Sequence, residues 1–170
     1  VVIIGAGTAG LSARKVVSKY TQNYVVIDDG ILGTTCARVG CMPSKAFIQV
    51  ANDFHRRNSF QDIGIAGSEA LKLDSEKVMS HTRKLRDRFV RSVLGGMEDW
   101  KDEHFIGKRA RFINRNEIDL GDSKISANKI IIATGSSPVV PKPWLEFSDL
   151  FSDTNSFFEL NRLPRSVGVI

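Results

Sequence analysis

A glycine-rich turn between a buried-strand pattern and a helical pattern constrains this chain more than any other feature. Residues 1–4 are Val-Val-Ile-Ile, a β-branched run suited to a strand buried on both faces, and they lead directly into Gly5. Gly5 allows a tight turn, Gly7 lets backbone approach a pyrophosphate, and Gly10 lets the next helix pack closely on the strand. A second strand pattern ends in Asp28, which is placed to accept a hydrogen bond from a ribose hydroxyl. This order predicts a dinucleotide-binding βαβ unit; the alternative is an ordinary βαβ unit whose glycines serve packing only.

The segments that follow the turn carry the periodicities that such a unit needs. A helix is expected after Gly10, with its free N-terminal N–H groups directed at the diphosphate. Apolar residues recur there at helical spacing and predict the face that packs on the sheet: Ala13, Val16, Val17 and Tyr20. The second strand is expected over residues 24–27, immediately before Asp28.

Cys36 and Cys41 are the only two cysteines of the chain, and their surroundings favour a redox pair. A zinc site normally needs at least three protein ligands, and none of the three histidines stands at a characteristic ligand spacing. A structural disulfide between two cysteines so close in sequence would close a loop too short to stabilise much. Pro43 can occupy the first position of a helix, whose dipole, together with Lys45, would favour the thiolate form. A metal site and an inert structural role remain the alternatives.

Two further helices are expected in the middle of the chain. One begins at Pro43, and the other is capped by Asp74 or Ser75 and reaches toward Trp100, with a break or kink at the glycine pair 95–96. The apolar stripe expected on the first helix is Ala46, Phe47, Val50, Ala51 and Phe54, and that expected on the second is Val78, Leu85, Phe89 and Val93.

The last part of the chain predicts strands and then an irregular connector. Three antiparallel strands are expected over residues 105–113, 117–120 and 124–132, because turn-forming residues separate them. Residues 130–132 are three isoleucines and indicate a buried strand. Prolines in the segment that follows are typical of a connector without regular structure.

Composition and charge exclude several classes of protein. The chain has 170 residues, of which 42% are hydrophobic and 25% are charged, as in a soluble globular α/β protein. The net charge is +5, and the densest basic segment, residues 83–91, is expected to be a solvated helix surface rather than a nucleic-acid-binding face. No apolar run approaches the about 18 residues of a membrane span, so no membrane partner and a cytoplasmic location are expected. Because the chain starts and ends within strand patterns, we expect it to be a fragment.

The run from Gly33 to Lys45 resembles the redox-active motif of the flavin-dependent pyridine nucleotide–disulfide oxidoreductases. The resemblance implies an α/β fold, a FAD/NAD(P)-binding Rossmann-like domain with three layers. These layers would be a central parallel sheet, helices on one face and a small antiparallel β-meander on the other. It also implies an FAD-binding domain over residues 1–140, a connector over 141–165 and the start of an NAD(P)-binding domain at 166–170.

The resemblance further implies a role for each motif residue. Cys36 would exchange with the substrate disulfide, Cys41 would lie against the isoalloxazine ring, and Lys45 would sit near flavin N5; these three would be the catalytic residues. Asp28 stands where the family usually has a glutamate that binds the adenosine ribose. The residues expected to bind FAD are Gly5, Ala6, Gly7, Thr8, Ala9, Gly10, Asp28, Asp29, Gly33, Thr34, Thr35, Cys36, Gly40, Cys41, Lys45, Ala110, Ala133, Thr134, Gly135 and Ser136.

The implied activity is disulfide oxidoreduction, foremost the oxidation of dihydrolipoamide by NAD⁺ through the disulfide of Cys36 and Cys41 and through FAD. NAD or NADP would bind a downstream domain, and a homodimer would complete the site, because the other subunit would donate a histidine base. Thr34 replaces a usual glycine and Arg38 a usual asparagine, which leaves the disulfide substrate open. The alternatives are a mercuric-reductase-like or other NAD(P)H-dependent disulfide reductase and, in another class, a non-catalytic nucleotide-binding redox sensor.

Overall fold

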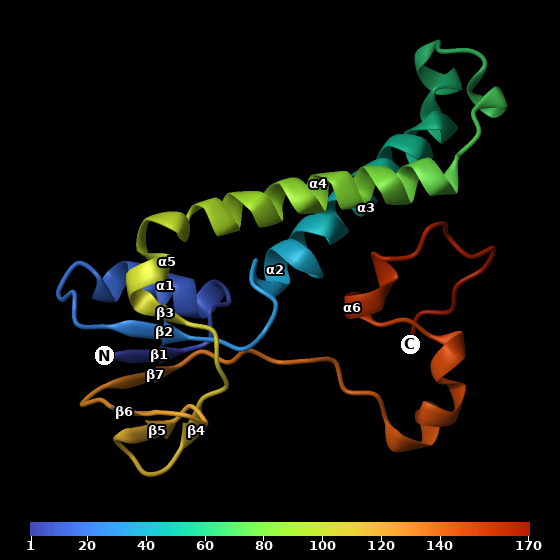
Figure 1. The fold of residues 1–170 in the computed structure, drawn as a ribbon. Coiled ribbons are helices and arrows are strands. Elements are labelled where there is room, and N and C mark those ends of the chain that lie inside the picture. Colours follow the sequence, from blue (N-terminus) through green and yellow to red (C-terminus); the bar gives the residue numbers. More distant parts are fainter. The chain divides into compact units, whose positions relative to one another are not determined.

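A computed structural model describes residues 1–170, and the chain divides into two compact units. The first unit combines Val1–Thr35 with Val90–Ser137, and the second combines Cys36–Phe89 with Pro138–Ile170. Figure 1 shows the elements of both units. Each unit is described by itself below. The domain boundaries inferred from the sequence stay a prediction.

A parallel sheet is the centre of the first unit. Its four strands are β1 (Val2–Ile4), β2 (Val25–Ile27), β3 (Phe105–Ile106) and β7 (Ile130–Ile132), in the order β3-β2-β1-β7. All three pairings are parallel. The helices α1 (Thr8–Val17) and α5 (Glu98–His104) lie on one face of this sheet (Figure 1).

A three-stranded meander covers the opposite face of the sheet (Figure 1). Its strands are β4 (Arg111–Phe112), β5 (Glu117–Asp119) and β6 (Lys124–Ser126), and both pairings are antiparallel. The α/β fold with helices, parallel sheet and meander in three layers is therefore confirmed.

The alternation of side chains along β1 explains the three layers. Val2 and Ile4 belong to a buried cluster with Ile118 of the meander, whereas Ile3 belongs to a second cluster with Trp100 of α5. Successive residues of a strand point to opposite faces, so a β-branched run with no polar residue is suited to a strand covered on both sides.

The strands expected after residue 104 are each divided between the two sheets. Residues 105–106 form β3 of the parallel sheet, and the chain leaves that sheet before β4 begins the meander. In the same way, the segment 124–132 contributes β6 to the meander and β7 to the parallel sheet. The expectation of three antiparallel strands is thus wrong at both ends. A β-propensity pattern marks where a strand forms but not which strand it will pair with.

Two expectations about burial are also wrong. Ile132 is 66% exposed, because β7 is an edge strand with β1 as its one neighbour in the sheet. On α1, Val16 and Tyr20 are 55% and 84% exposed. The helix ends at Val17, so Tyr20 lies beyond it, and the residues that pack toward the sheet are Leu11, Ala13 and Val17.

The second unit is mainly helical. It contains the short helix α2 (Thr35–Arg38), then α3 (Cys41–His55), and most of α4 (Ser75–Gly95), with 3-10 turns at 56–59, 61–63 and 68–70 between α3 and α4. Pro43 is the third residue of α3 rather than the first, because the helix already begins at Cys41. The expected cap at Asp74 is confirmed: its carboxylate accepts a hydrogen bond from the Lys77 amide, 3.1 Å away. The helix α4 ends at Gly95, as the glycine pair predicted.

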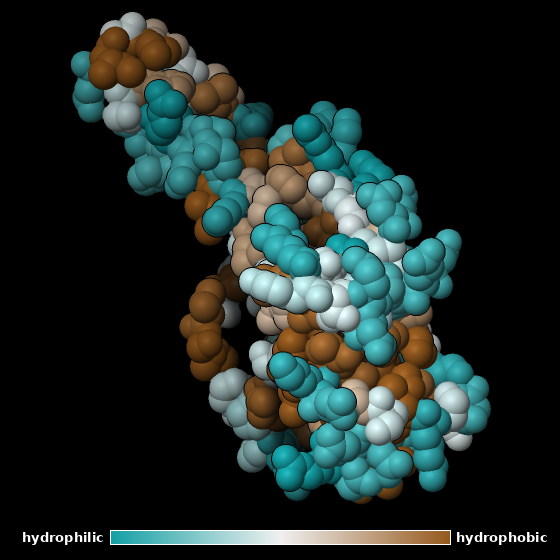
Figure 2. Space-filling view, turned by 90° about the vertical axis from the view of Figure 1, so that its left-hand side faces the viewer, coloured by the Kyte–Doolittle hydropathy of each residue, from teal (hydrophilic) through white to brown (hydrophobic).

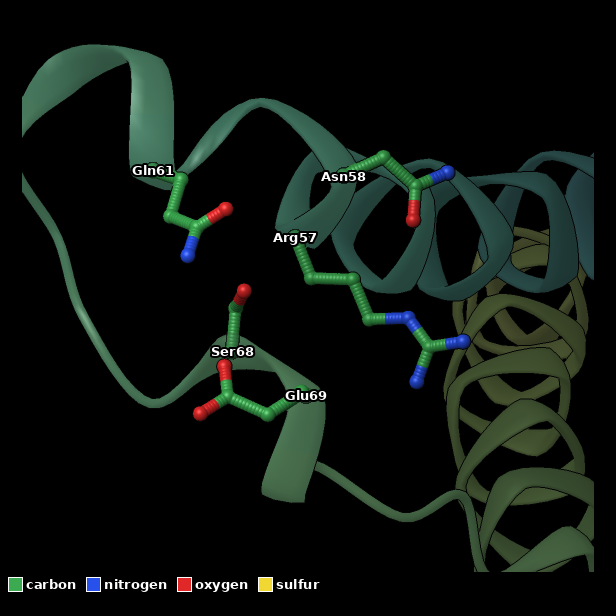
Figure 3. A pocket seen from close by; sticks show the side chains of 5 residues that line it. All are labelled: Arg57, Asn58, Gln61, Ser68 and Glu69. Carbon is green, nitrogen blue, oxygen red and sulfur yellow. The ribbon is translucent and has the colours of Figure 1, made fainter.

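The turns between α3 and α4 form the tip of this helical pair. A polar pocket of about 240 Å³ there is lined by Arg57, Asn58, Gln61, Ser68 and Glu69 (Figure 3). The Arg57 guanidinium donates to the carbonyl of Leu71 and lies over the Phe54 ring. The same segment has four exposed aliphatic residues, Ile63, Ile65, Leu71 and Leu73. Hydrophobic atoms gather at the upper left of Figure 2.

The connector packs on α3 and α4 within the second unit. It contains a 3-10 segment (Lys142–Leu150) and the helix α6 (Thr154–Phe157), which Asp153 caps. The Phe157 ring meets the Phe47 ring edge-on at 5.5 Å between centroids. Residues 166–170 form no strand in this structure. None of the helices combines the length and the apolar character needed to cross a membrane.

Two arginines of α4 hold the end of the connector. Arg83 donates to the carbonyl of Leu160, and Arg86 pairs with Glu159 as well as with Asp87. Burial alone would lower the pKa of Arg86, but the two carboxylates outweigh it and raise that pKa. The connector is therefore attached to α4 by charged hydrogen bonds as well as by ring contacts.

Candidate functional site

Two of the three glycines in the first turn are required by packing within the protein. Gly5 has a φ of 109°, and a Cβ there would lie 2.7 Å from the carbonyl carbon of Ala133. A Cβ on Gly10 would lie 2.8 Å from the carbonyl carbon of Gly5 and would overlap its oxygen. Only glycine therefore fits at these two positions: the segment after β7 passes against Gly5, and the first turn of α1 crosses the end of β1 at Gly10.

Gly7 is different, because no protein atom occupies the space in front of it. A Cβ on Gly7 would meet nothing within 4 Å, and its φ of −75° is one that any residue adopts. Gly7 is also the N-cap of α1, no side chain caps that end, and no acidic residue lies in the first turn. A helix N-terminus with open space before it fits a diphosphate, which the N–H groups and the dipole would bind.

Asp28 binds the glycine turn as well as standing where a ribose is expected. One carboxylate oxygen accepts from the Ala6 amide at 2.5 Å, and the other accepts from the Gly30 amide at 2.7 Å. This link between Asp28 and the glycine turn was not predicted from the sequence. The signal was available, because Asp28 directly follows β2, and β2 pairs with β1 directly before the turn. Asp29, which follows, is exposed.

The segment after β7 completes the group of motifs in the first unit. The Ala133 amide donates to the Ile4 carbonyl at 2.8 Å, so this segment continues alongside β1 to the glycine turn. Gly135 has a φ of 69°, and Thr134 and Ser136 are exposed. The structure thus brings residues 5–10, Asp28 and Ala133 together at the carboxyl ends of the parallel strands, where open α/β sheets bind ligands.

Ala110 and the loop before Cys36 stand apart from that group. Ala110 packs, partly buried, against the core between sheet and meander, and its role toward adenine stays a prediction.

In the loop before Cys36, Gly33 and Thr34 both have positive φ, at 109° and 63°. Thr34 is the one non-glycine residue of the chain in that region, and it is 8% exposed. A β-branched residue is strained there, so the departure from glycine carries a conformational cost.

Cys36 and Cys41 lie within reach of each other in the second unit, and both thiols are free. Cys36 is on α2, and Cys41 is the first residue of α3, preceded by Gly40 as its N-cap. A hydrogen bond between the two thiols, together with partial burial and the nearby Cys41, raises the pKa of Cys36 above its ordinary value. The charge of Lys45 acts in the opposite direction but is outweighed.

This shift of Cys36 differs from the thiolate character expected of it. A helix dipole and a lysine favour the thiolate, but a neutral Cys36 thiol can donate a hydrogen bond to the sulfur of Cys41, which stabilises the protonated form. Cys36 is half-buried and Cys41 is exposed, so exposure does not by itself assign the substrate-facing thiol. The roles of Cys36, Cys41 and Lys45 stay a prediction. These three residues lie in the second unit and the glycine turn in the first.

Comparison with known proteins gives a match over the whole chain. The family profile described as pyridine nucleotide-disulphide oxidoreductase matches residues 1–170. The chain is 30% identical over 172 residues to a dihydrolipoyl dehydrogenase of Geobacillus stearothermophilus, covering 99% of this chain and 36% of that protein. It is 28% identical over 169 residues to a mercuric reductase of Lysinibacillus sphaericus, covering 99% of this chain and 31% of that protein. The chain thus spans about a third of the length of these relatives.

A solved structure shows the same fold. The chain resembles the HOCl-induced flavoprotein disulfide reductase RclA from Escherichia coli, in its Cu(II) complex, with a TM-score of 0.71 and 23% identity. That match covers 96% of this chain and 34% of the RclA chain.

Proposed function

The chain belongs to the pyridine nucleotide-disulphide oxidoreductase family, and from that premise we propose that it forms the FAD-binding and dithiol part of a disulfide oxidoreductase. Proteins of this family bind FAD and NAD(P). One observation carries the proposal: the open space at Gly7, in front of an uncapped helix N-terminus, has the form of a diphosphate site. The free thiols of Cys36 and Cys41, close enough to share a hydrogen bond, add the group that a disulfide oxidoreductase needs.

The residues around Gly7 would hold the cofactor through backbone groups. The N–H groups at the start of α1 would bind the diphosphate, and the Asp28 carboxylate would keep the turn in shape through its bond to the Ala6 amide. FAD, when bound, supplies two-electron transfer between a dithiol and a pyridine nucleotide. The exposed backbone from Thr134 to Ser136 lies at the same edge of the sheet and is available for further contacts.

The two cysteines would carry the exchange with substrate. With Cys36 and Cys41 joined as a disulfide, a thiolate of a dithiol substrate attacks Cys36 and displaces the Cys41 thiolate. The second substrate thiol, once deprotonated, then attacks the mixed disulfide and displaces the Cys36 thiolate. The substrate leaves as a disulfide, and its two electrons remain on the protein as the reduced thiols of Cys36 and Cys41. The free, hydrogen-bonded thiols of the structure correspond to this two-electron-reduced form.

Dihydrolipoamide with NAD⁺ is the substrate pair that we propose first. The run Cys41-Met42-Pro43-Ser44-Lys45 has a serine after the proline, as in dihydrolipoamide dehydrogenases or mercuric reductases. The relatives named dihydrolipoyl dehydrogenase and mercuric reductase differ by two percentage points in identity to this chain, so a mercuric-reductase-like or other NAD(P)H-dependent disulfide reductase is the second candidate. A homodimer in the cytoplasm is part of the same proposal.

Flavin absorbance tests the proposal directly. The purified protein should retain a band near about 450 nm, and mild reduction should add a long-wavelength charge-transfer band from a thiolate against the flavin. Cys41→Ser should abolish that charge-transfer band, and the matched variant Cys36→Ser should keep it. A protein that retains no flavin would contradict the enzyme proposal and favour a redox sensor without turnover. The reverse pattern in the two variants would exchange the roles of the two cysteines.

A further inference from the structure

The N-terminal end of α3, where Cys41 lies, receives little support from the residues next to it. Gly40 directly precedes the helix, its φ of −123° and ψ of −114° are not helical, and no side chain caps the helix end. Pro43 is the one buried residue among the 15 of α3. A helix of this length is stiff, so a contact made further along it can set the position of Cys41.

The connector makes such a contact through the short helix α6, which lies beside the N-terminal half of α3 (Figure 1). The Phe157 ring of α6 meets the Phe47 ring of α3 edge-on, with 5.5 Å between centroids, and both residues are half-buried. Phe47 lies six residues after Cys41, or about 9 Å along the helix axis. On its other side, the Phe157 ring meets the buried Phe158 ring edge-on at 5.3 Å. Aromatic pairs prefer this edge-on arrangement, so the rings fix α3 against α6.

The helix α6 is braced at its start and tied to α4 at its end. Asp153 and Ser156 form a capping box at the start. Shortly after the last residue of α6, Arg86 of α4 pairs with Glu159, and a second arginine of α4 donates to the next carbonyl. The Arg86 side chain is 13% exposed, so water screens this pair less than it screens a pair on the open surface. The connector thus presents the Phe157 ring to α3 from a segment that is attached to α4.

Both the side chain and the backbone of Cys41 reach Cys36. The hydrogen bond between the two thiols raises the pKa of Cys36, and the Cys41 amide, which donates to the same sulfur, lowers that pKa. The bond between the thiols has the larger effect. Hydrogen bonds weaken steeply as their geometry departs from the optimum, so both bonds depend on where α3 begins. A small displacement of α3 would therefore change the thiol chemistry of Cys36.

We propose that Phe157 of the connector is a positioning residue for the dithiol: its contact with Phe47 holds α3 where Cys41 bonds to Cys36. The inference rests on the proposed redox function of the two cysteines. Phe157 would act through α3 rather than on either sulfur. The glycine turn belongs to the other compact unit, so a change at Phe157 should alter the thiols and leave FAD binding at Gly7 unaffected.

The pH dependence of alkylation tests this proposal on the reduced, purified protein. Iodoacetamide reacts with the thiolate, and trypsin cleaves after Arg38, between the cysteines, so the peptide masses report each cysteine separately. Phe157→Ala should weaken the bond between the thiols and lower the midpoint pH for Cys36 by at least half of the shift that Cys41→Ala produces. Phe157→Tyr retains the ring and should retain the wild-type midpoint.

Two further variants separate positioning from a general loosening of the connector. The matched control is Phe147→Ala, which removes an exposed phenylalanine ring elsewhere in the connector and should leave the midpoint unchanged. Glu159→Gln loosens α6 from α4 at a carboxylate that is 57% exposed, so this variant should fold, and it should lower the midpoint in the same direction as Phe157→Ala. Circular dichroism shows whether each variant is folded.

A double-mutant cycle with Cys41→Ala decides whether Phe157 acts through Cys41. In that background the bond between the thiols is already absent, so Phe157→Ala should no longer lower the midpoint pH for Cys36. The proposal is overturned if Phe157→Ala lowers the midpoint equally in both backgrounds, if folded Phe157→Ala and Glu159→Gln both keep the wild-type midpoint, or if Phe147→Ala lowers it as much as Phe157→Ala. Flavin absorbance is read separately, so a wild type without flavin would contradict the proposed function and leave these thiol results unchanged.

Discussion

Alanine substitutions at Gly7 and Gly10 should separate a loss of FAD affinity from a loss of stability. A Cβ on Gly10 would lie 2.8 Å from the Gly5 carbonyl carbon, closer than Cβ atoms approach backbone in folded proteins, and the atom that must move is backbone of β1. Gly10→Ala should therefore lower the free energy of unfolding by about 3 kcal/mol or more, a large part of the about 5–15 kcal/mol of a typical domain.

Gly7→Ala should leave the fold intact. Its Cβ meets no protein atom within 4 Å, and its backbone angles suit alanine. A small loss from the poorer N-cap and a small gain from the stiffer unfolded chain should keep the net change within about 1 kcal/mol. The same Cβ would occupy the space that we assign to the diphosphate, so FAD affinity should fall at least about tenfold.

Two measurements on the apoprotein decide between these outcomes. Urea unfolding followed by circular dichroism gives the free energy of unfolding of each variant, and quenching of flavin fluorescence gives its FAD affinity. If Gly7→Ala binds FAD as well as the wild type, the space before α1 is not the diphosphate site. If Gly10→Ala is as stable as the wild type, the packing argument for α1 against β1 is refuted.

Three further substitutions test other parts of the structure. Thr34→Gly should relieve the strain of the positive φ and raise the free energy of unfolding by about 1 kcal/mol, whereas Thr35→Gly, within a helix, should lower it by a similar amount. If urea unfolding gives the same change for both variants, Thr34 is not strained. Cys41→Ala removes the hydrogen bond that raises the pKa of Cys36, so alkylation of Cys36 by iodoacetamide should reach its half-maximal rate at a lower pH. An unchanged or higher midpoint pH would show that the hydrogen bond with Cys41 does not raise the pKa of Cys36. Asp28→Ala leaves the Ala6 and Gly30 amides without their acceptor, so it should lower the free energy of unfolding of the cofactor-free protein by about 1–3 kcal/mol. A loss of FAD affinity with unchanged stability would show that Asp28 serves only the ligand.

Local patterns predicted elements of both units where an element depends on the residues within it. The β-branched run before Gly5, the glycine spacing and the cap at Asp74 all appear in the structure where they were expected. The same run indicated a strand covered on both sides, and the resemblance to the family implied the three layers. The cysteine spacing and its surroundings indicated the family, and the family profile confirms it.

Partners in space, by contrast, cannot be obtained from a local pattern. Residues 105–113 have β-propensity throughout, yet β3 pairs with β2 and β4 pairs with β5. Ile132 was expected to be buried and is exposed, because burial depends on whether another strand lies beyond β7. Periodicity shows which residues share a face but not what covers that face.

The sequence by itself determined the chemistry that this chain can carry: a glycine turn suited to a dinucleotide, two cysteines and a lysine, in an order typical of one oxidoreductase family. Tertiary structure decided what each of these groups contacts. It divided the glycines into Gly10, which packing requires, and Gly7, which faces open space, and it showed that Cys36 shares a hydrogen bond with Cys41. The physical reason is that steric overlap and pKa both depend on the positions of atoms in other residues to within a few tenths of an ångström, and only the folded backbone sets those positions.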